Sequence, residues 1–367
     1  MNPDCMRQAL DLARQGLGRT SPNPAVGAVV AREGQVLGSG FHTWAGLKHA
    51  EILALEEAGA QARGASLYVS LEPCSHQGRT PPCVDAIIAA GVSRVIAPLA
   101  DPNPLVAGQG FRQLREAGLE VVLASEFAAE AELLNQPYFH FMRTGRPLVT
   151  LKAALTLDGK IAAPEDNVGW ITSGQARAHV QQLRHLSDAI LTGIGTVLSD
   201  DCLLTDRSGL PRSRPLLRIV LDSQLRLPLA SRMVAGASSD LLVVTTSAAP
   251  PERRRVLEDR GVSVLTLDGP AGRTDLPALV QHLARQRYLS LMIEAGSKVN
   301  WAALESRIVD RIFFYYAPKI LGGLQSLPVV GGAGRRSRRE AILFRNVVVH
   351  PITPEEFAVE AWLVKET

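Results

Sequence analysis

Four residues in the first quarter of the chain have the types and spacing of a catalytic zinc site: His49, Glu51, Cys74 and Cys83. Zinc binds imidazole nitrogen and thiolate sulfur, and three protein ligands leave a fourth tetrahedral position open. In such a site zinc lowers the pKa of water toward neutrality. Glu51, two residues after His49, is placed to carry protons without binding the metal. The sequence therefore predicts His49, Cys74 and Cys83 as metal ligands and Glu51 as a catalytic residue.

The order H-x-E, then P-C, then C is typical of zinc deaminases of nucleobases. One feature differs, because eight residues separate Cys74 from Cys83 where the usual gap is two. Taken singly, the cysteines are more simply buried thiols and Glu51 a helix acid. His76 is a rival ligand, although its position inside the loop favours contact with a substrate. A structural zinc module is the alternative, but it needs four ligands and leaves Glu51 without a purpose.

The elements around these residues predict a sheet covered by helices. Apolar runs at 25–31, 66–71 and 93–99 are typical of strands, and the segments 49–59 and 82–91 of helices that end at glycine. Cys74 would follow a strand, and Cys83 would lie in the first turn of a helix, where a thiolate is favoured. The segment 125–145 predicts one connecting helix. We therefore expect one domain at 1–145 and a second at 146–367.

The second part alternates strands and helices again. Strand candidates occupy 147–155, 189–193, 216–223, 240–246, 262–267, 290–296 and 310–318, and helix candidates occupy 175–186 and 276–287. The segments 346–352 and 358–364 predict a closing hairpin. The arginine-rich segment 331–341 is most simply a solvated loop.

Composition limits the class of protein. The 367 residues carry a net charge of +3, which is too small to favour nucleic acid or an anionic membrane as the main partner. No apolar run is long enough to span a bilayer, and no export signal is present. Four cysteines make a poor disulfide framework in a chain of this length. We expect a cytoplasmic enzyme with reduced thiols and a small-molecule substrate.

The stretches "TSPNPAVGAVV", "HAE", "EPCSHQGRTPPC" and "DPNPLVAGQGFRQLREAG" resemble the deaminase half of the bifunctional riboflavin-biosynthesis deaminase–reductases. The long cysteine spacing also matches that family, which usually has lysine where this chain has Arg79. For each pocket residue that the resemblance implies, the simpler alternative is a turn or cap residue. The implied substrate-binding residues are Asn23, His42, His76, Arg79, Asp101 and Asn103.

After the expected boundary the chain contains "LKAALTLDGKIA", "WITS", "ILTGIGTVLSDDCLLTDR" and "IEAGSKVNWAAL", and none of these is a G-x-G-x-x-G motif. Spacing alone leaves a dinucleotide cofactor open. All four stretches are similar to the reductase half of the same family, which uses NADPH. By that resemblance the catalytic groups are Lys152, Asp200 and Glu294. The implied cofactor contacts are Ala154, Trp170, Thr196, Asp200, Gly296, Ser297, Lys298, Val299, Asn300, Trp301 and Ala302. The implied substrate contacts are Arg184, Leu204, Arg207 and Glu294.

The resemblance implies a cytidine-deaminase-like α/β/α domain followed by a dihydrofolate-reductase-like α/β domain, with zinc and NADPH as cofactors. The first would deaminate 2,5-diamino-6-ribosylamino-4(3H)-pyrimidinone 5′-phosphate by hydrolysis. The second would reduce 5-amino-6-(5-phosphoribosylamino)uracil to the ribityl compound, and two arginines suit a substrate phosphate. The alternative is a zinc deaminase of nucleic-acid or nucleoside bases joined to an unrelated α/β domain. A homo-oligomer is possible.

Overall fold

The chain folds into two compact units. The computed structural model describes residues 1–44, 47–77, 80–165 and 169–364. One unit contains Met1–Arg146 with Pro211–Arg214, and the other contains Pro147–Leu210 with Pro215–Thr367. Each unit has its own sheet and its own buried core.

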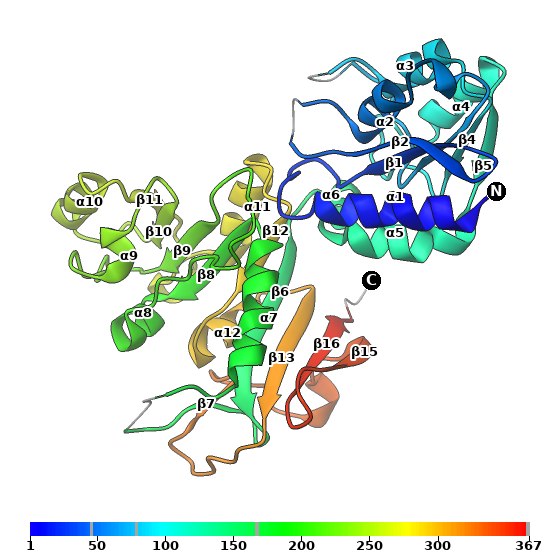
Figure 1. The fold of residues 1–367 in the computed structure, drawn as a ribbon. Coiled ribbons are helices and arrows are strands. Elements are labelled where there is room, and N and C mark those ends of the chain that lie inside the picture. The colour runs from blue at the N-terminus through cyan, green and yellow to red at the C-terminus, as the bar shows by residue number, and fades with distance from the viewer. Residues whose placement is uncertain (45–46, 78–79, 166–168, 365–367) are drawn as a thin grey trace. The chain divides into compact units, whose positions relative to one another are not determined.

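The first unit is a five-stranded sheet with helices on both faces (Figure 1). The strand order is β2-β1-β3-β4-β5, with β1 antiparallel to β2 and β3 and the last three strands parallel. The strands are β1 (Gly27–Arg32), β2 (Gln35–Phe41), β3 (Ser66–Val69), β4 (Arg94–Ala97) and β5 (Glu120–Leu123). The helices are α1 (Pro3–Gln15), α2 (Ala50–Ala58), α3 (Cys83–Ala90), α4 (Gln109–Glu116), α5 (Ala128–Leu134) and α6 (Gln136–Thr144).

Alternate residues of β1 enter different cores. Ala28 and Val30 pack with α2, α3 and α4, whereas Val29 and Ala31 pack with α1 and α5. Successive side chains of a strand point to opposite faces, so a strand that is covered on both faces is apolar throughout. The unit therefore has the α/β/α layering that the sequence predicts.

The predicted helix over 125–145 is wrong in one respect, because the segment forms two helices, α5 and α6, that are separated at Asn135. The buried side chain of Asn135 accepts a hydrogen bond from the N–H of Ala25 and donates one to its carbonyl, both at 2.8 Å. Pro137 then lies in the first turn of α6, where a missing N–H does no harm. A long-range hydrogen-bond pair thus ends α5 at a point that helical periodicity does not reveal.

The second unit is built on a nine-stranded sheet in the order β11-β10-β9-β8-β12-β6-β13-β16-β15. All pairs from β11 to β13 are parallel, and the last two pairs are antiparallel. Its strands are β6 (Leu148–Thr156), β8 (Ala189–Gly193), β9 (Leu217–Leu221), β10 (Leu241–Thr245), β11 (Ser263–Thr266), β12 (Ser290–Ile293), β13 (Arg311–Ala317), β15 (Phe344–Pro351) and β16 (Phe357–Leu363); β7 (Lys160–Ala162) and β14 (Leu327–Pro328) pair separately. Its helices are α7 (Gly174–His185), α8 (Ile194–Asp200), α9 (Arg232–Ala235), α10 (Pro251–Glu258), α11 (Leu276–Arg285) and α12 (Ser297–Glu305).

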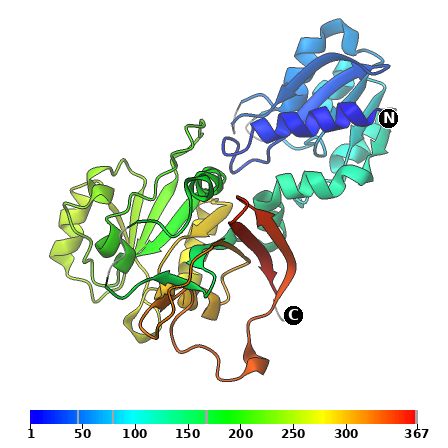
Figure 2. The same cartoon turned by 60° about the horizontal axis from the view of Figure 1, so that its bottom comes forward.

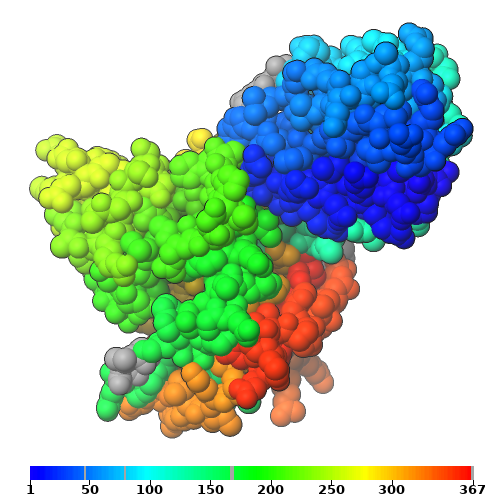
Figure 3. All heavy atoms as spheres, viewed as in Figure 1, coloured from blue at the N-terminus to red at the C-terminus, as the bar shows by residue number. Residues whose placement is uncertain are grey.

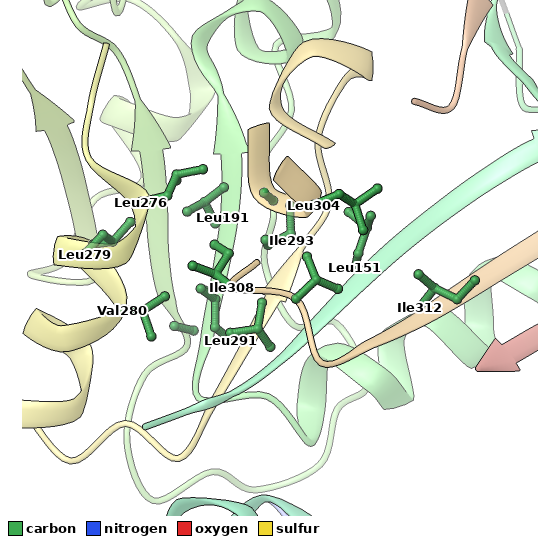
Figure 4. Packing of buried hydrophobic residues seen from close by; sticks show 14 of the residues in the cluster. Leu151, Leu191, Leu276, Leu279, Val280, Leu291, Ile293, Leu304, Ile308 and Ile312 are labelled. Carbon is green, nitrogen blue, oxygen red and sulfur yellow. The ribbon is translucent and has the colours of Figure 1, made fainter. Parts of the chain in front are cut away.

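Both faces of this sheet are buried as well. Helices α11 and α12 cover one face, and Figure 4 shows Leu151, Leu191 and Ile293 of the strands lying beside Leu304 of α12. On the other face, α7 packs against β13 and α8, α9 and α10 pack farther along the sheet. Covered faces explain why each strand is an apolar run in the sequence.

The closing hairpin is confirmed, since β15 and β16 pair antiparallel at the end of the sheet (Figures 1 and 2). β15 is the edge strand, and the side chains of Val347, Val348 and Val349 are exposed. Figure 3 shows this hairpin, in red, at the surface of its unit. Among the described residues, no helix combines the length and the apolar character needed to cross a bilayer.

Glycines of β2 allow α2 to approach the sheet closely. A Cβ added to Gly38 would lie 2.3 Å from the carbonyl oxygen of Ala54 and 2.6 Å from the nitrogen of Ala58. At Gly40 it would lie 2.5 Å from the Cβ of Leu53. Both glycines therefore set the distance between the sheet and the helix that begins next to His49.

We predict that Gly38→Ala destabilises the first unit by about 1–3 kcal/mol, because backbone atoms of α2 must move to admit the methyl group. The change in the free energy of unfolding can be measured by urea titration, with release of bound metal as the signal. Val36→Ala on the same strand is the control, since the Val36 side chain is 40% exposed and its loss should leave the packing of α2 unchanged. Equal midpoints for Gly38→Ala and the unsubstituted protein would contradict the close-packing argument.

Candidate active sites

The first site forms where two helices begin beside the end of a strand. His49 is the N-cap residue of α2, Cys83 is the first residue of α3, and Cys74 follows β3. One imidazole nitrogen and the two sulfurs all lie within 4.8 Å of one another. The hydrogen bond to Cys74 and burial raise the pKa of the Cys83 thiol, so of the two sulfurs Cys83 keeps the proton. A bound cation would favour the thiolate form of both.

Thr80 fixes the orientation of the His49 ring. The Nδ1 of His49 lies 3.1 Å from the Cys83 sulfur and 3.5 Å from the Cys74 sulfur, while its Nε2 lies 3.3 Å from the hydroxyl oxygen of Thr80. With Nδ1 facing the sulfurs, the Nε2–H donates to Thr80, as the outer nitrogen of a metal-binding histidine usually does to a neighbour. Sequence reasoning missed Thr80, because a threonine in a loop carries no signal of this role.

The donor set of this site fits zinc. A hydrogen bond from Cys83 lowers the pKa of Cys74, and burial raises it. The hydrogen bond outweighs burial, and the pKa of Cys74 falls to about 4. Burial raises the pKa of Glu51, whose side chain lies in the interior next to the ligands. Two sulfurs and one imidazole make a three-ligand zinc set with an open position, which supplies a Lewis acid that activates water. His49, Cys74 and Cys83 would hold the ion, and Glu51 would move the proton.

Two of the residues implied for the substrate pocket adjoin this cluster. The rings of His42 and His49 are 5.0 Å apart in a T-shaped arrangement, and the Nδ2 of Asn23 lies 3.1 Å from the Nε2 of His42. Burial lowers the pKa of His42 to about 4, so the ring is neutral and its Nε2 can accept the hydrogen bond. His76 is exposed, and Arg79 lies outside the described residues.

A buried carboxylate secures the loop that carries Asp101 and Asn103. Glu72 accepts hydrogen bonds from the N–H groups of Asp101, Gly108 and Phe111 at 2.9–3.1 Å. Asp101 in turn accepts from the N–H of Asn103 at 2.8 Å, and burial raises its pKa to about 6. Both Asp101 and Asn103 therefore make the local contacts of turn residues, and their substrate contacts stay predictions. Sequence reasoning missed Glu72, because a glutamate beside the Pro-Cys motif carries no local signal of this role.

The second site is centred on Glu294, which follows β12. Its carboxylate lies 3.0 Å from the Nζ of Lys152 on β6 and 2.9 Å from a guanidinium nitrogen of Arg184 on α7. The Lys152 and Arg184 side chains are 7% and 9% exposed. Burial acts to raise the pKa of Glu294, but the two neighbouring cations outweigh it and hold the pKa at about 2. The structure thus brings together three of the predicted residues, although 142 positions separate Lys152 from Glu294.

Helix α7 also fixes the loop that contains Arg207. Arg184 donates to the carbonyl of Thr205 at 3.0 Å, and His185 lies 2.9 Å from the carboxylate of Asp206. The N–H of Arg207 donates to the side chain of Gln181 at 2.8 Å, and the Arg207 side chain is exposed. Its backbone is therefore held while its guanidinium can reach a ligand.

The N-terminus of α12 has features of an anion site. Ser297 is 6% exposed and Asn300 is fully buried, yet the Ser297 Oγ and the Asn300 Oδ1 have no hydrogen-bond partner among the described residues. A Cβ on Gly296 would lie 3.7 Å from the hydroxyl of Thr196, so these two turns lie side by side. Helix N-termini offer N–H groups and positive potential to phosphates. This set fits the phosphates of a dinucleotide.

The remaining predicted residues are more dispersed. Leu204 has a φ of 51° and is buried in a hydrophobic cluster. Trp170 is 68% exposed and lies beneath the guanidinium of Arg177. Asp200 is exposed at the end of α8. Ala154 is half-buried beside Tyr315. Along α12, Lys298 is exposed, Val299 and Ala302 are half-buried, and Trp301 is buried.

Fold and sites together define a two-domain enzyme in which a zinc-dependent deaminase is joined to a dinucleotide-dependent reductase. Residues 2–98 match the model of the cytidine and deoxycytidylate deaminase zinc-binding region, and residues 147–352 match that of the RibD C-terminal domain. The second match rules out an unrelated α/β domain in the C-terminal half.

Relatives and solved structures cover nearly the whole chain. The riboflavin biosynthesis protein RibD of Actinobacillus pleuropneumoniae is 43% identical, with 92% of this chain and 89% of that protein covered. That of Escherichia coli K12 is 44% identical, with 88% and 90% covered. The structure of Acinetobacter baumannii RibD, form 1, has a TM-score of 0.87 and 36% identity and covers 99% of this chain and 98% of that one.

The chain belongs to the RibD family of riboflavin biosynthesis proteins. It is a bifunctional enzyme with a zinc-dependent deaminase and an NADPH-dependent reductase, and the predicted fold class of a cytidine-deaminase-like domain before a dihydrofolate-reductase-like domain is confirmed.

We predict that Cys74→Ser and Cys83→Ser each reduce bound zinc from about one ion per chain to a small fraction, because a serine hydroxyl is a poor substitute for a soft thiolate ligand. Elemental analysis of the purified variants measures the loss. Cys202→Ser is the matched control, since Cys202 is half-buried beside a different hydrophobic cluster. Full zinc content in both ligand variants would disprove the assignment.

Proposed function

We propose that the two domains catalyse consecutive steps on one phosphorylated pyrimidine. The first would convert 2,5-diamino-6-ribosylamino-4(3H)-pyrimidinone 5′-phosphate to its deaminated product by hydrolysis. The second would reduce 5-amino-6-(5-phosphoribosylamino)uracil with NADPH. A 34% identical Thermotoga maritima protein, with a TM-score of 0.84 and 98% of each chain covered, bears the names of these two activities. We assign them to residues 1–145 and 146–367.

In the deaminase we assign proton transfer to Glu51. The side chain is 3% exposed and lies within the cluster of His49, Cys74 and Cys83, and burial raises its pKa, so the carboxylate binds a proton more strongly than an exposed glutamate does. A carboxyl group that exchanges a proton easily can accept one from the attacking water and deliver it to the departing amine. Asn23 and His42, which lie beside His49, are the best placed of the implied pocket residues to contact the base. Substrate contacts of His76, Arg79, Asp101 and Asn103 remain part of this proposal.

In the reductase we assign proton transfer to the cluster of Glu294, Lys152 and Arg184. Reduction of the ribosylamine requires its ring to open, so the sugar oxygen must receive a proton while NADPH, when bound, supplies a hydride. The Glu294 carboxylate lies 3.0 Å from the Nζ of Lys152 and orients it, which makes Lys152 the group that donates a hydrogen bond or proton to the substrate. Arg184 positions Glu294, and the exposed Arg207 is the proposed phosphate ligand. Asp200 and Leu204 remain proposed neighbours of the reacting groups.

The cofactor proposal rests on α12 and the turn before it. The Ser297 Oγ and the Asn300 Oδ1 are buried and have no hydrogen-bond partner in the part of the chain that the structure describes. The neighbouring residues Gly296 and Thr196 bring a second turn to the same place. We place the phosphates of NADPH at this helix N-terminus. The other predicted cofactor contacts, Ala154, Trp170, Asp200 and 298–302, remain part of this proposal.

Three broader proposals concern the setting of the enzyme. The cysteines are free thiols, and thiols stay reduced in the cytosol, which supports a cytoplasmic location. The weak net charge supports the absence of a nucleic-acid partner. The exposed valines of the edge strand β15 support self-association at that edge.

We predict that Glu51→Gln lowers deamination by about 100-fold or more, because the amide keeps the size of the side chain but cannot carry a proton. Mass spectrometry of the products from the diaminopyrimidine phosphate measures this step. Reduction of already deaminated substrate by the same variant should stay near normal. Asp200→Asn should show the opposite pattern.

Glu56→Gln is the matched control, because Glu56 lies on the same helix but is exposed and paired with Lys48. Loss of both activities in a folded, zinc-loaded Glu51→Gln protein would refute the assignment of separate sites.

We predict that Ser297→Ala weakens NADPH binding by about 10-fold, because a hydrogen bond to a charged phosphate contributes about 1.5–3 kcal/mol. Calorimetric titration measures the affinity. Ser306→Ala at the other end of α12 is the control, since the Ser306 hydroxyl donates to the carbonyls of Ala302 and Ala303. Unchanged affinity in Ser297→Ala would remove Ser297 from the cofactor site.

A further inference from the structure

The ammonium of Lys152 has a second neighbour that the established activity does not explain. Its Nζ lies 5.7 Å from the centroid of the Tyr315 ring, on the strand next to its own. In the parallel register of β6 and β13, Lys152 lies opposite Phe313 and Ala154 lies opposite Tyr315. An ammonium within about 6 Å of an aromatic ring centroid is attracted by the negative face of the ring. Lys152 is thus held by Glu294 and faces the π system of Tyr315.

The Tyr315 ring is itself fixed from the helix above. Its hydroxyl lies 2.6 Å from the Nδ1 of His179 on α7. Burial raises the pKa of Tyr315 and lowers that of His179, so the phenol keeps its proton and donates it in a hydrogen bond to a neutral imidazole. Phe313 packs beside both rings, with centroids 5.3 Å from Tyr315 and 5.7 Å from His179. Tyr315 is 1% exposed, so the ring has little freedom to turn.

Helix α7 therefore contacts the reductase site twice. Arg184 binds Glu294, and His179 binds Tyr315, so one helix secures both groups that flank Lys152. A lysine side chain has four rotatable bonds, and a single ion pair leaves its direction loosely defined. The ring of Tyr315 restricts this freedom from the other side.

We propose that Tyr315, held by His179, is a positioning residue of the reductase that directs the Lys152 ammonium toward the substrate. This inference rests on the proposed role of Lys152. Tyr315 acts through Lys152 and does not itself exchange a proton with the substrate.

The test is a double-mutant cycle in the full-length enzyme, with NADPH and the deaminated phosphoribosylaminouracil as substrates. We expect Tyr315→Leu to lower the reductase kcat by about 10-fold while the KM for NADPH changes less than about 3-fold, because a desolvated cation–π contact has an energy of this order. In a Lys152→Met background, Tyr315→Leu should cause little further loss. A full 10-fold further loss in that background would overturn the proposal.

Tyr316→Leu is the matched control. Tyr316 is the next residue on β13, points to the other face of the sheet and stacks on Phe357 with centroids 5.1 Å apart. Its replacement should leave the reductase kcat within about 2-fold of that of the unsubstituted enzyme. A loss of kcat equal to that of Tyr315→Leu would mean that distortion of the strand causes the effect, and would overturn the proposal. An unchanged affinity for NADPH, measured by calorimetric titration, reports that the second unit of each variant has folded.

His179→Ala keeps the proposal testable if Tyr315→Leu does not fold, because His179 is only partly buried on a helix. It should lower the reductase kcat by about 3-fold with Lys152 present and have no effect in the Lys152→Met background. An unchanged kcat in His179→Ala, or an equal loss in both backgrounds, would contradict the positioning role. Normal reductase activity in Lys152→Met alone would instead refute the proposed function of Lys152, so the two failures are distinguishable.

Discussion

Parallel strand pairing is the constraint on which both sites depend. In parallel strands the carboxyl ends meet at one edge of the sheet, and the helices that follow begin there. Cys74 follows β3 and Cys83 begins α3, while Glu294 follows β12 and α12 begins three residues later. Each unit thus collects strand ends and helix N-termini in one place. Thiolates and phosphates are both anionic, and both are favoured at helix N-termini.

Within that frame, the two sites handle buried charge differently. At the deaminase site, the sulfurs and Glu51 concentrate negative charge around a place suited to a cation. At the reductase site, Glu294 is compensated by Lys152 and Arg184, and its pKa falls to about 2. Burying an ion pair costs several kcal/mol of desolvation per ion, so such a cluster is weak evidence for stability. The cluster is better explained by the chemistry that we propose for a positioned ammonium.

Much of the fold follows from local patterns. The apolar runs of the second unit correspond to its strands because both faces of that sheet are covered, and the closing hairpin shows the expected pairing. The connecting helix was mispredicted at Asn135, where the break is caused by hydrogen bonds to Ala25, 110 positions away in the chain. Helical periodicity is a property of neighbouring residues and contains no information about such a contact.

For the sites, the sequence by itself predicted the zinc ligands and Glu51, because metal coordination demands particular residue types and the H-x-E and P-C patterns are local; the structure brings the three ligand side chains together. Its resemblance to a family supplied Lys152, Arg184 and Glu294, and the structure shows that these three meet. Only the tertiary structure decided the supporting residues, Thr80 at the zinc cluster and Glu72 behind the Asp101 loop. It alone decided the Tyr315–His179 pair as well. A threonine, a glutamate or a tyrosine has many ordinary uses, and what distinguishes these is the register of strands and the packing of helices that bring distant segments within hydrogen-bonding distance.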